Sequence, residues 1–502
     1  MKENILQSNY ETNERTIAEV FQQSKKSFDF TTYSPVASSE FLEISYFSTM
    51  VDMNILQQSV LISLKEKIAD VQQLSDLKNI IPIESIQFVE SGQDLEKGLH
   101  TGAVAVYFKN HLEEIALLNI GNSRLGQRET NETENEFSVI GPKVGFIEDL
   151  NSNLHLLRDH LATTDLIIEQ FAIGTRTKTS VAVAYLEGVT NPQYINTAKQ
   201  RILDLDVDGV FDSTELEQMI SDHSRSPFPL FISTERVDRA SAALLKGELI
   251  LMCDKSPYAL IGPITLMDFF STPEDFYLPS VIASFFKLIR IFGMLFSIFA
   301  TAFYVAILTY HFEVIPKDLL GPLIFSRASV PFPPFIEALF LEVTIDLLRE
   351  AGARLPAKIG QTLGIVGGIV IGQATVQAAL TSNILLIIVA LAALSSFTTP
   401  IYKLSNAVRL LRYPFIILAA IWGGLGIYIG ILFLIGHLLR LKSLGIPYLV
   451  PLYPYRKGGV SHSFLRPSPE GDGKRPSFFR VLSNLRFKPS ANQDPEDGLN
   501  SE

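Results

Sequence analysis

The chain has 502 residues, a formal net charge of −11 and a single cysteine. The negative charge argues against a nucleic acid partner. A single cysteine excludes an intrachain disulfide framework and fits a reducing compartment. The mean hydropathy of +0.23 averages two unlike parts. About the first 280 residues have the composition of a charged soluble protein, whereas residues 288–438 are dominated by apolar runs.

The first part of the chain is predicted to be a tail followed by two α/β subdomains. Residues 1–38 are polar and are expected to form a flexible tail, without the apolar core of a signal peptide. Residues 39–135 form the first subdomain, with a helix in FSTMVDMNILQQSVLISL and a strand in GAVAVYF. Residues 136–280 form the second. It has a buried strand in VAVAYLEGV, a helix in INTAKQRILDL, and a hairpin of ELILMC with YALIG. We expect this soluble part to stay in the cytoplasm.

A helical membrane domain is predicted over residues 281–440. Residues 319–347 are ambiguous, because they hold charged residues and a group of three prolines, Pro331, Pro333 and Pro334. Proline-rich backbone is tolerated at membrane depth only where protein buries it or where it lines water. We interpret this segment as a break followed by an amphipathic helix from about Phe335 to Arg349. The four clear spans are expected at about 288–310, 359–380, 383–399 and 414–436.

Charge does not settle the topology. Residues 441–502 form a basic C-terminal tail, which favours the cytoplasm, and the connection with Lys403, Arg409 and Arg412 favours it too. Four spans place the tail inside and the connection outside, and five spans do the reverse. We favour four spans with a re-entrant or interfacial 319–347. The stretch SFFRVLSNLRFKPS of the tail fits a segment lying on anionic lipid or a partner-binding tail.

Four glycines recur every fourth residue inside one apolar stretch: Gly360, Gly364, Gly368 and Gly372. On a helix they share one face and form a bare stripe about 18 Å long. Such a stripe lets a second helix approach closely in lipid. Gln361 and Gln373 flank the stripe and are poorly suited to face lipid. The pattern indicates a packed or pore-adjacent helix, which serves either tight packing within the chain or contact between subunits.

Three carboxylates lie on the predicted amphipathic helix: Glu337, Glu342 and Asp346. A charge at the centre of a bilayer costs about 2.5–3.5 kcal/mol on insertion scales, so such acids usually face a cavity or a partner. Rings of carboxylates from several subunits attract cations. These acids therefore line an ion path, or they belong to an interfacial helix and face water or pair with Arg349 and Arg354.

The run DLDVDGVFDSTE matches the spacing of an EF-hand calcium loop. The hit is single, whereas EF-hands usually occur in pairs. The competing interpretation is a turn followed by a helix that begins near Thr214, with Ser213 or Thr214 as the N-cap. The latter interpretation is favoured. The candidate calcium ligands are Asp204, Asp206, Asp208, Asp212 and Glu215.

No motif indicates an enzyme or a cofactor. The chain has no nucleotide-binding loop of the Walker or Rossmann type, and no HExxH, GxSxG or paired CxxC motif. Cys253 lies in the apolar run LILMC and is expected to be a core residue. We predict that the chain has no catalytic residues.

Four long stretches carry a resemblance to a known family: GPKVGFIEDLNSNLHLLRDHL, SPFPLFISTERVDRASAALLKGELILMCDKSPYALIGP, FFSTPEDFY and VPFPPFIEALFLEVTIDLLREAGARLPAKIGQTLGIVGGIVIGQA. Together they resemble the A subunits of the GerA family of spore germinant receptors. The resemblance runs from about Gly141 to Pro454 and more loosely back to about residue 40. An A-subunit-like protein of the stage V sporulation operon belongs to the same family and is an alternative relative.

The resemblance implies a multi-pass protein of the spore inner membrane. Such proteins work with a permease-like B subunit, which recognises the nutrient, and a lipoprotein C subunit. The A subunit is expected to self-associate and to transmit the signal, as an ion-channel subunit. The alternative is a non-conducting scaffold that couples the permease-like partner to later events. A secondary transporter is a weaker idea, because transporters usually show internal repeats and none is visible here.

Overall fold

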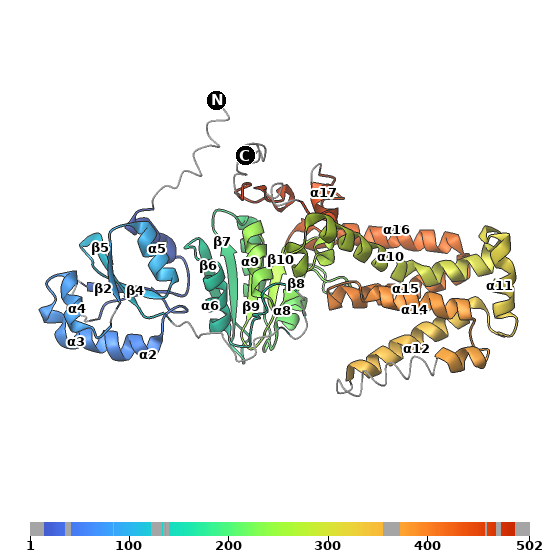
Figure 1. Ribbon diagram of the computed structural model, residues 1–502, viewed down its shortest axis with the longest axis horizontal. Helices are drawn as coiled ribbons and strands as arrows, with labels where there is room; N and C mark the ends of the chain where they lie inside the picture. The colour runs from blue at the N-terminus through green and yellow to red at the C-terminus, as the bar shows by residue number, and fades with distance from the viewer. Residues whose placement is uncertain are drawn as a thin grey trace, which may run out of the picture. The chain divides into compact units, whose positions relative to one another are not determined.

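The computed structural model describes residues 15–35, 42–83, 85–121, 133, 136, 140–354, 372–456, 459–467 and 473–486. The chain divides into two compact units (Figure 1). The N-terminal unit comprises residues 1–224, 231–263 and 472–502, and the helical unit comprises residues 225–230 and 264–471.

The first half of the N-terminal unit is a five-stranded antiparallel sheet in the order β1-β2-β4-β5-β3. Its side chains alternate between two cores, as a pleated strand requires. In β4, Val104 and Val106 join one core, and Ala105 and Tyr107 join the other with α1 and α5. The strands are β1 Phe30–Tyr33, β2 Leu42–Phe47, β3 Ile86–Val89, β4 Ala103–Phe108 and β5 His111–Asn119.

Short helices cover both faces of this sheet. The face opposite α1 and α5 buries Leu56, Val60 and Leu64, which belong to one continuous run of helical turns after Asp52. The helices are α1 Ile17–Ser24, α2 Met53–Ile55, η1 Leu56–Leu61, α3 Ile62–Lys67, η2 Ile68–Asp70, η3 Leu74–Asp76, α4 Leu77–Ile80 and α5 Gly92–His100.

The second half is another five-stranded antiparallel sheet, in the order β6-β7-β9-β10-β8. Helices α6 and α9 pack on one face, and α7 and α8 contact β6, β9 and β10. Strand β9 is buried on both faces, which explains its uninterrupted apolar run LILMC. The elements are β6 Leu166–Ile173, β7 Thr179–Leu186, β8 Ile232–Thr234, β9 Leu249–Cys253, β10 Ala259–Gly262, α6 Leu150–His160, α7 Pro192–Leu203, α8 Ser213–Ile220 and α9 Val237–Lys246.

Several predicted elements of the N-terminal region are present. These are the strand in GAVAVYF, the strand in VAVAYLEGV, the helix in INTAKQRILDL and the hairpin of ELILMC with YALIG. Cys253 is buried in the core as expected. The helix predicted from Phe47 begins only at Met53, because Phe47 ends β2 and Asp52 caps the helix.

The predicted flexible tail over residues 1–38 is wrong for residues 17–33. Helix α1 buries Ile17, Val20 and Phe21 against the first sheet. Thr16 and Glu19 form a capping box at its start, and β1 pairs with β2. The apolar positions of α1 follow helical spacing, but the helix spans only eight residues. The polar composition around it masked this short signal.

The basic tail predicted over residues 441–502 also contains ordered structure. Residues 473–486 belong to the N-terminal unit. The backbone N–H of Leu482 donates to the carbonyl of Val189, and Asn191 donates to the carbonyl of Arg480. In the stretch that fitted a lipid-lying or partner-binding segment, residues 477–486 therefore lie against the half of the N-terminal unit that holds the second sheet. The other elements after residue 441 are β11 Lys442–Ser443, β12 Ile446–Pro447, α17 Gly459–Phe464 and η8 Ser477–Phe479.

The helical unit is built around α10, which contacts α12, α14, α15 and α16 (Figure 1). By length and composition, α10 and α15 are the two helices among the described residues that could cross a membrane, and α14 and α16 are shorter apolar helices. The bounds are η4 Leu266–Phe270, η5 Pro273–Phe276, α10 Ser280–Tyr310, η6 Phe312–Val314, α11 Lys317–Arg327, α12 Pro334–Arg354, α14 Asn383–Ser396, α15 Tyr402–Trp422 and α16 Gly424–Arg440.

One predicted span differs from the structure. The span at 414–436 is divided between α15 and α16 at Gly423, whose φ of 59° and ψ of −134° suit only glycine. Helix α15 begins at Tyr402, so Lys403, Arg409 and Arg412 lie on a helix and not in a connection. The predicted break in 319–347 lies between α11 and α12. Of the span predicted at 359–380, the structure describes only residues from 372 onward.

Candidate functional site

Glu342 lies at the centre of a buried polar cluster in the helical unit. Its side chain is 1% exposed, and its carboxylate accepts from Arg412 Nη1 at 2.9 Å and from Thr301 Oγ1 at 2.7 Å. Arg412 also donates to Ser297 Oγ at 2.5 Å and to the carbonyl of Ala392 at 2.9 Å. One acid on α12 is thereby connected to α10, α14 and α15.

The other two acids of α12 also have arginine partners. Glu337 is fully buried and accepts from Arg327 Nη2 at 2.7 Å and from the backbone N–H of Ser382 at 3.2 Å, at the start of α14. Asp346 is partly buried; Arg409 lies 3.4 Å away and the Tyr413 hydroxyl donates at 2.6 Å. The three acids thus fix α12 to four neighbouring helices.

These partners differ from the two arginines that the sequence suggested. Arg349 donates to Ser396 and lies 4.1 Å from the centre of the Phe397 ring. Arg354 pairs with Glu350 on the exposed surface of α12. Sequence reasoning recognised Glu337, Glu342 and Asp346 but not their partners. The sequence signal that could have revealed these partners is charge balance, because arginines in and beside apolar helices need carboxylates.

Most of the glycine stripe lies outside the described residues. Gly360, Gly364, Gly368 and Gln361 belong to this part of the chain, whereas Gly372 and Gln373 are described. A Cβ added at Gly372 would lie 3.8 Å from a methyl group of Leu386 on α14, which is ordinary contact. The role of the stripe remains a prediction.

The candidate calcium loop is engaged in local bonds. Asp208 is 82% exposed and lies 3.7 Å from Arg176, and Asp204 follows the end of α7. Asp212 is the N-cap of α8, in place of the predicted Ser213 or Thr214, and accepts from the backbone of Thr214. Glu215 accepts from the backbone N–H of Phe211. Asp206 shares this loop. In the part of the chain that the structure describes, no group of three or more acidic, His or Cys residues could hold a metal ion.

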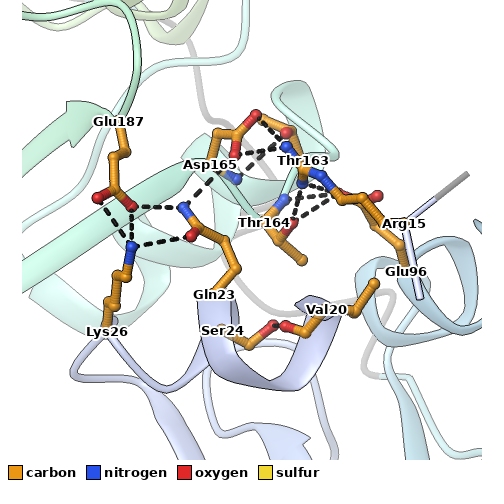
Figure 2. Close-up of polar contacts among 10 residues, drawn as sticks. All are labelled: Arg15, Val20, Gln23, Ser24, Lys26, Glu96, Thr163, Thr164, Asp165 and Glu187. Carbon is orange, nitrogen blue, oxygen red and sulfur yellow. Dashed lines mark hydrogen bonds and ion pairs between the residues drawn. The ribbon is translucent and has the colours of Figure 1, made fainter. Parts of the chain in front are cut away.

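A second polar cluster joins the two halves of the N-terminal unit. Figure 2 shows Arg15 directed toward Thr164 and Asp165, and Gln23 and Lys26 directed toward Glu187. Arg15 donates to both Asp165 oxygens, at 2.8 and 2.9 Å. The partners are far apart in the sequence, and none was singled out from it.

A buried ion pair reinforces the same boundary. Arg158 of α6 is 0% exposed and donates to both carboxylate oxygens of Asp29, at 2.5 and 2.7 Å. Burial alone would raise the pKa of Asp29, but the charge and hydrogen bonds of Arg158, with those of Thr49 and Ser27, lower it below its ordinary value. The two halves are therefore connected by a fully desolvated pair.

Together, these features describe a unit of two antiparallel sheets followed by an apolar helical unit with buried acid–arginine pairs. The family described as "Bacillus/Clostridium GerA spore germination protein" matches residues 15–478. The chain is 45% identical to spore germination protein GerQA of Bacillus cereus over 475 residues, covering 95% of this chain and 94% of that protein. The chain belongs to the GerA family of germinant receptor A subunits, which confirms the family expected from its motifs.

The chain is also similar to two further proteins. Spore germination protein GerIA of Bacillus cereus is 44% identical over 453 residues, which cover 90% of this chain and 67% of that protein. The crystal structure of the N-terminal domain of the A subunit of the Bacillus megaterium spore germinant receptor GerK3 is 25% identical. It aligns with a TM-score of 0.37 and covers 50% of this chain and 95% of that chain. These relatives are named as proteins of spore germination.

Proposed function

We propose that this chain is the A subunit of a germinant receptor in the spore inner membrane and that it transduces the nutrient signal as an oligomeric ion-channel subunit. The observation that carries the proposal is the set of buried carboxylates on α12, each bonded to an arginine inside an apolar helical unit. Ionisable groups within membrane helices are costly and commonly mark ion pathways or moving elements.

The acid–arginine pairs suit α12 to a change of state. A buried pair is stable only while both partners stay together. Movement of α12 away from α15 would separate Glu342 from Arg412 and leave each charge needing a new partner. A carboxylate from each of several subunits could then attract cations. In this proposal, Glu337, Glu342 and Asp346 are held by arginines at rest and line the ion path in the conducting state.

The C-terminal segment supports an even number of membrane crossings. Residues 473–486 pack on the N-terminal unit, with Arg475 donating to the carbonyl of Leu245. The chain would therefore return to the side of the membrane on which its N-terminal unit lies. We propose that this side is the cytoplasm, because the tail is basic. Four crossings, with α11 and the start of α12 re-entrant or interfacial, satisfy both conditions.

The proposed partners are a permease-like B subunit that binds the nutrient and a lipoprotein C subunit. Self-association through the glycine stripe would place several A subunits around one path. A scaffold without conductance is the second candidate function. It is favoured by one observation, namely that in this state the three acids of α12 are already bonded to arginines and so offer no free charge to a cation.

Spores that carry charge-neutral variants test the proposal. The double variant Glu342→Gln/Arg412→Gln removes one buried pair without changing the net charge. The matched control is Glu350→Gln/Arg354→Gln, which removes the exposed pair of the same helix. With a panel of amino acids, sugars and nucleosides as triggers, we expect slower cation release from the first variant and unchanged release from the control. Normal release kinetics in both variants, at equal protein levels in the membrane fraction, would contradict a role for this pair.

A further inference from the structure

An apolar groove runs along one side of α10. It has a volume of about 530 Å³ and lies between α10, the start of α14 and α11. Phe292, Phe296, Phe299 and Phe303 line it at helical spacing from α10, and Ile384 and Ile388 line it from α14. The groove is open on one side, since Phe292 is 67% and Phe303 is 48% exposed.

A second cavity continues the groove. It has a volume of about 440 Å³ and shares Leu308, Ile315 and Leu323 with the first. Its lining is apolar with one exception, the guanidinium of Arg327 at the end of α11. Arg327 donates through Nη2 to Glu337. Its buried Nε has no hydrogen-bond partner among the described residues. The combined cavity is a long apolar channel with one cationic donor at its end.

The dimensions suit an acyl chain. The groove extends along α10 from Phe292 to Leu308, which is about 24 Å at the helical rise. One leaflet of a bilayer is about half of the roughly 30 Å hydrocarbon core. A chain that spans one leaflet therefore fits within the groove, with its polar end near α11.

We propose that this groove binds one phospholipid with an anionic headgroup, with an acyl chain along α10 and the phosphate at Arg327. The inference rests on the proposed membrane location of the helical unit. The Arg327 side chain keeps its pair with Glu337 and is still 21% exposed. An arginine guanidinium has several planar donors and recognises phosphate through them, which favours this occupant. A helix of a second copy would fill the apolar part but would bring no phosphate to the exposed part of the Arg327 side chain.

The test measures phospholipid retention by the purified full-length chain. The protein is equilibrated with equal amounts of phosphatidylglycerol and phosphatidylcholine of the same acyl composition, and bound lipid is counted by native mass spectrometry. We expect one retained phospholipid, with phosphatidylglycerol preferred about tenfold, which corresponds to about 1.4 kcal/mol.

Three variants separate the parts of the site. Ala300→Phe places a large ring in the groove and should abolish retention of both lipids. Ala351→Phe makes the same change at an exposed position of α12 and should behave as the unaltered protein. Arg327→Gln/Glu337→Gln removes the cation and its acid together, and should keep retention but lose the preference for phosphatidylglycerol. Circular dichroism and size-exclusion profiles check folding of each variant.

Equal retention of the two lipids by the unaltered protein, or unchanged retention by Ala300→Phe, would overturn the proposal. A second copy in the groove is tested with Ala300→Cys, because Cys253 is the chain's single cysteine and is buried. An efficient disulfide-linked dimer in membranes would also overturn it.

Recovery of the chain without detergent in the soluble fraction would reject the proposed membrane location itself. Ion flux without lipid preference would reject the lipid site alone.

Discussion

At the scale of single residues, two buried ion pairs hold this protein together. Arg158 and Asp29 are 0% and 1% exposed, and Arg412 and Glu342 are 2% and 1% exposed. Removing one member of such a pair leaves an uncompensated buried charge, which typically costs about 3–5 kcal/mol. Removing both members with side chains of similar volume costs much less. Each pair therefore makes the position of one element depend on another.

The Glu342–Arg412 pair provides a direct test of this dependence. We expect Arg412→Met to lower the thermal unfolding temperature of the detergent-purified chain more than the double variant Glu342→Gln/Arg412→Met does. Glu350→Gln removes an exposed acid of the same helix and should have little effect. Fluorescence of Trp422, the sole tryptophan, reports on the helical unit. A double variant less stable than Arg412→Met would show that the pair is not the stabilising unit.

His100 makes the stability of the N-terminal unit depend on pH. Burial, followed by the nearby charge of Arg158, lowers the pKa of His100 from 6.5 to about 4. The unfolded chain binds this proton below about pH 6.5 and the folded chain does not, so stability is complete above pH 6.5. It falls by at most about 3 kcal/mol as the pH drops toward 4. The lowered pKa of Asp29 acts only at more acidic pH.

The variant His100→Phe should remove this pH dependence. A phenylalanine can keep the stacking on Phe47, whose ring centre lies 5.4 Å from that of His100. Hydrogen exchange in α5 and β2, corrected for the intrinsic effect of pH, measures the change between pH 7 and 4.5. The exposed His111→Gln serves as the control. An unchanged pH dependence in His100→Phe would assign it to other groups.

At the scale of elements, local patterns predicted several strands and helices, whereas the pairing of distant residues was not predicted. The apolar runs of β4, β7 and β9 are visible in the sequence because burial on both faces leaves no polar alternation. The acids of α12 were recognised because charges in an apolar stretch are unusual. Their partners were not, because Arg412 lies 70 positions from Glu342 and Arg409 lies 63 positions from Asp346. Only the packing of α15 against α12 brings them together.

The division between α15 and α16 depends on one glycine. Gly423 has a backbone conformation that costs other residues about 1–3 kcal/mol, and an added Cβ would lie 2.9 Å from the Tyr310 ring. Gly423→Ala should therefore lower the unfolding temperature. Gly436→Ala, within α16 and with no atoms within 4 Å of an added Cβ, should be neutral or stabilising by up to about 1 kcal/mol. Equal unfolding temperatures for the two variants would contradict this explanation of the break.

At the scale of the whole molecule, the first and the last described segments, residues 15–35 and 473–486, belong to the same unit. Residues 473–486 complete the surface around Val189, Leu245 and Gly247 of the N-terminal unit. The sequence left four and five spans open because its charges conflict. Arg409 and Arg412 lie on α15 and bond to acids of α12, so the proposed topology does not count them as loop charges.

Cysteine labelling in sealed membrane vesicles checks the proposed topology. We expect a membrane-impermeant maleimide to react with Lys109→Cys and Ser477→Cys from the same side, because both residues belong to the N-terminal unit. Glu313→Cys, at the exposed connection between α10 and α11, should react from the opposite side. The unaltered protein, whose single cysteine is buried, is the background control. Reaction of Ser477→Cys and Lys109→Cys from opposite sides would exclude an even number of crossings.

The most direct measurement is cation flux from vesicles that contain the chain together with its permease-like and lipoprotein partners. The account predicts flux on addition of the triggering nutrient. It also predicts loss of flux with Gly364→Leu, whose bulk would block close helix approach, and retention with Gly436→Leu on the open side of α16. Position 364 lies outside the described residues, so the result bears on the stripe independently of the structure. A complete, folded complex that releases no cations would contradict the ion-channel role and leave the scaffold. Equal flux from Gly364→Leu would contradict the role of the glycine stripe.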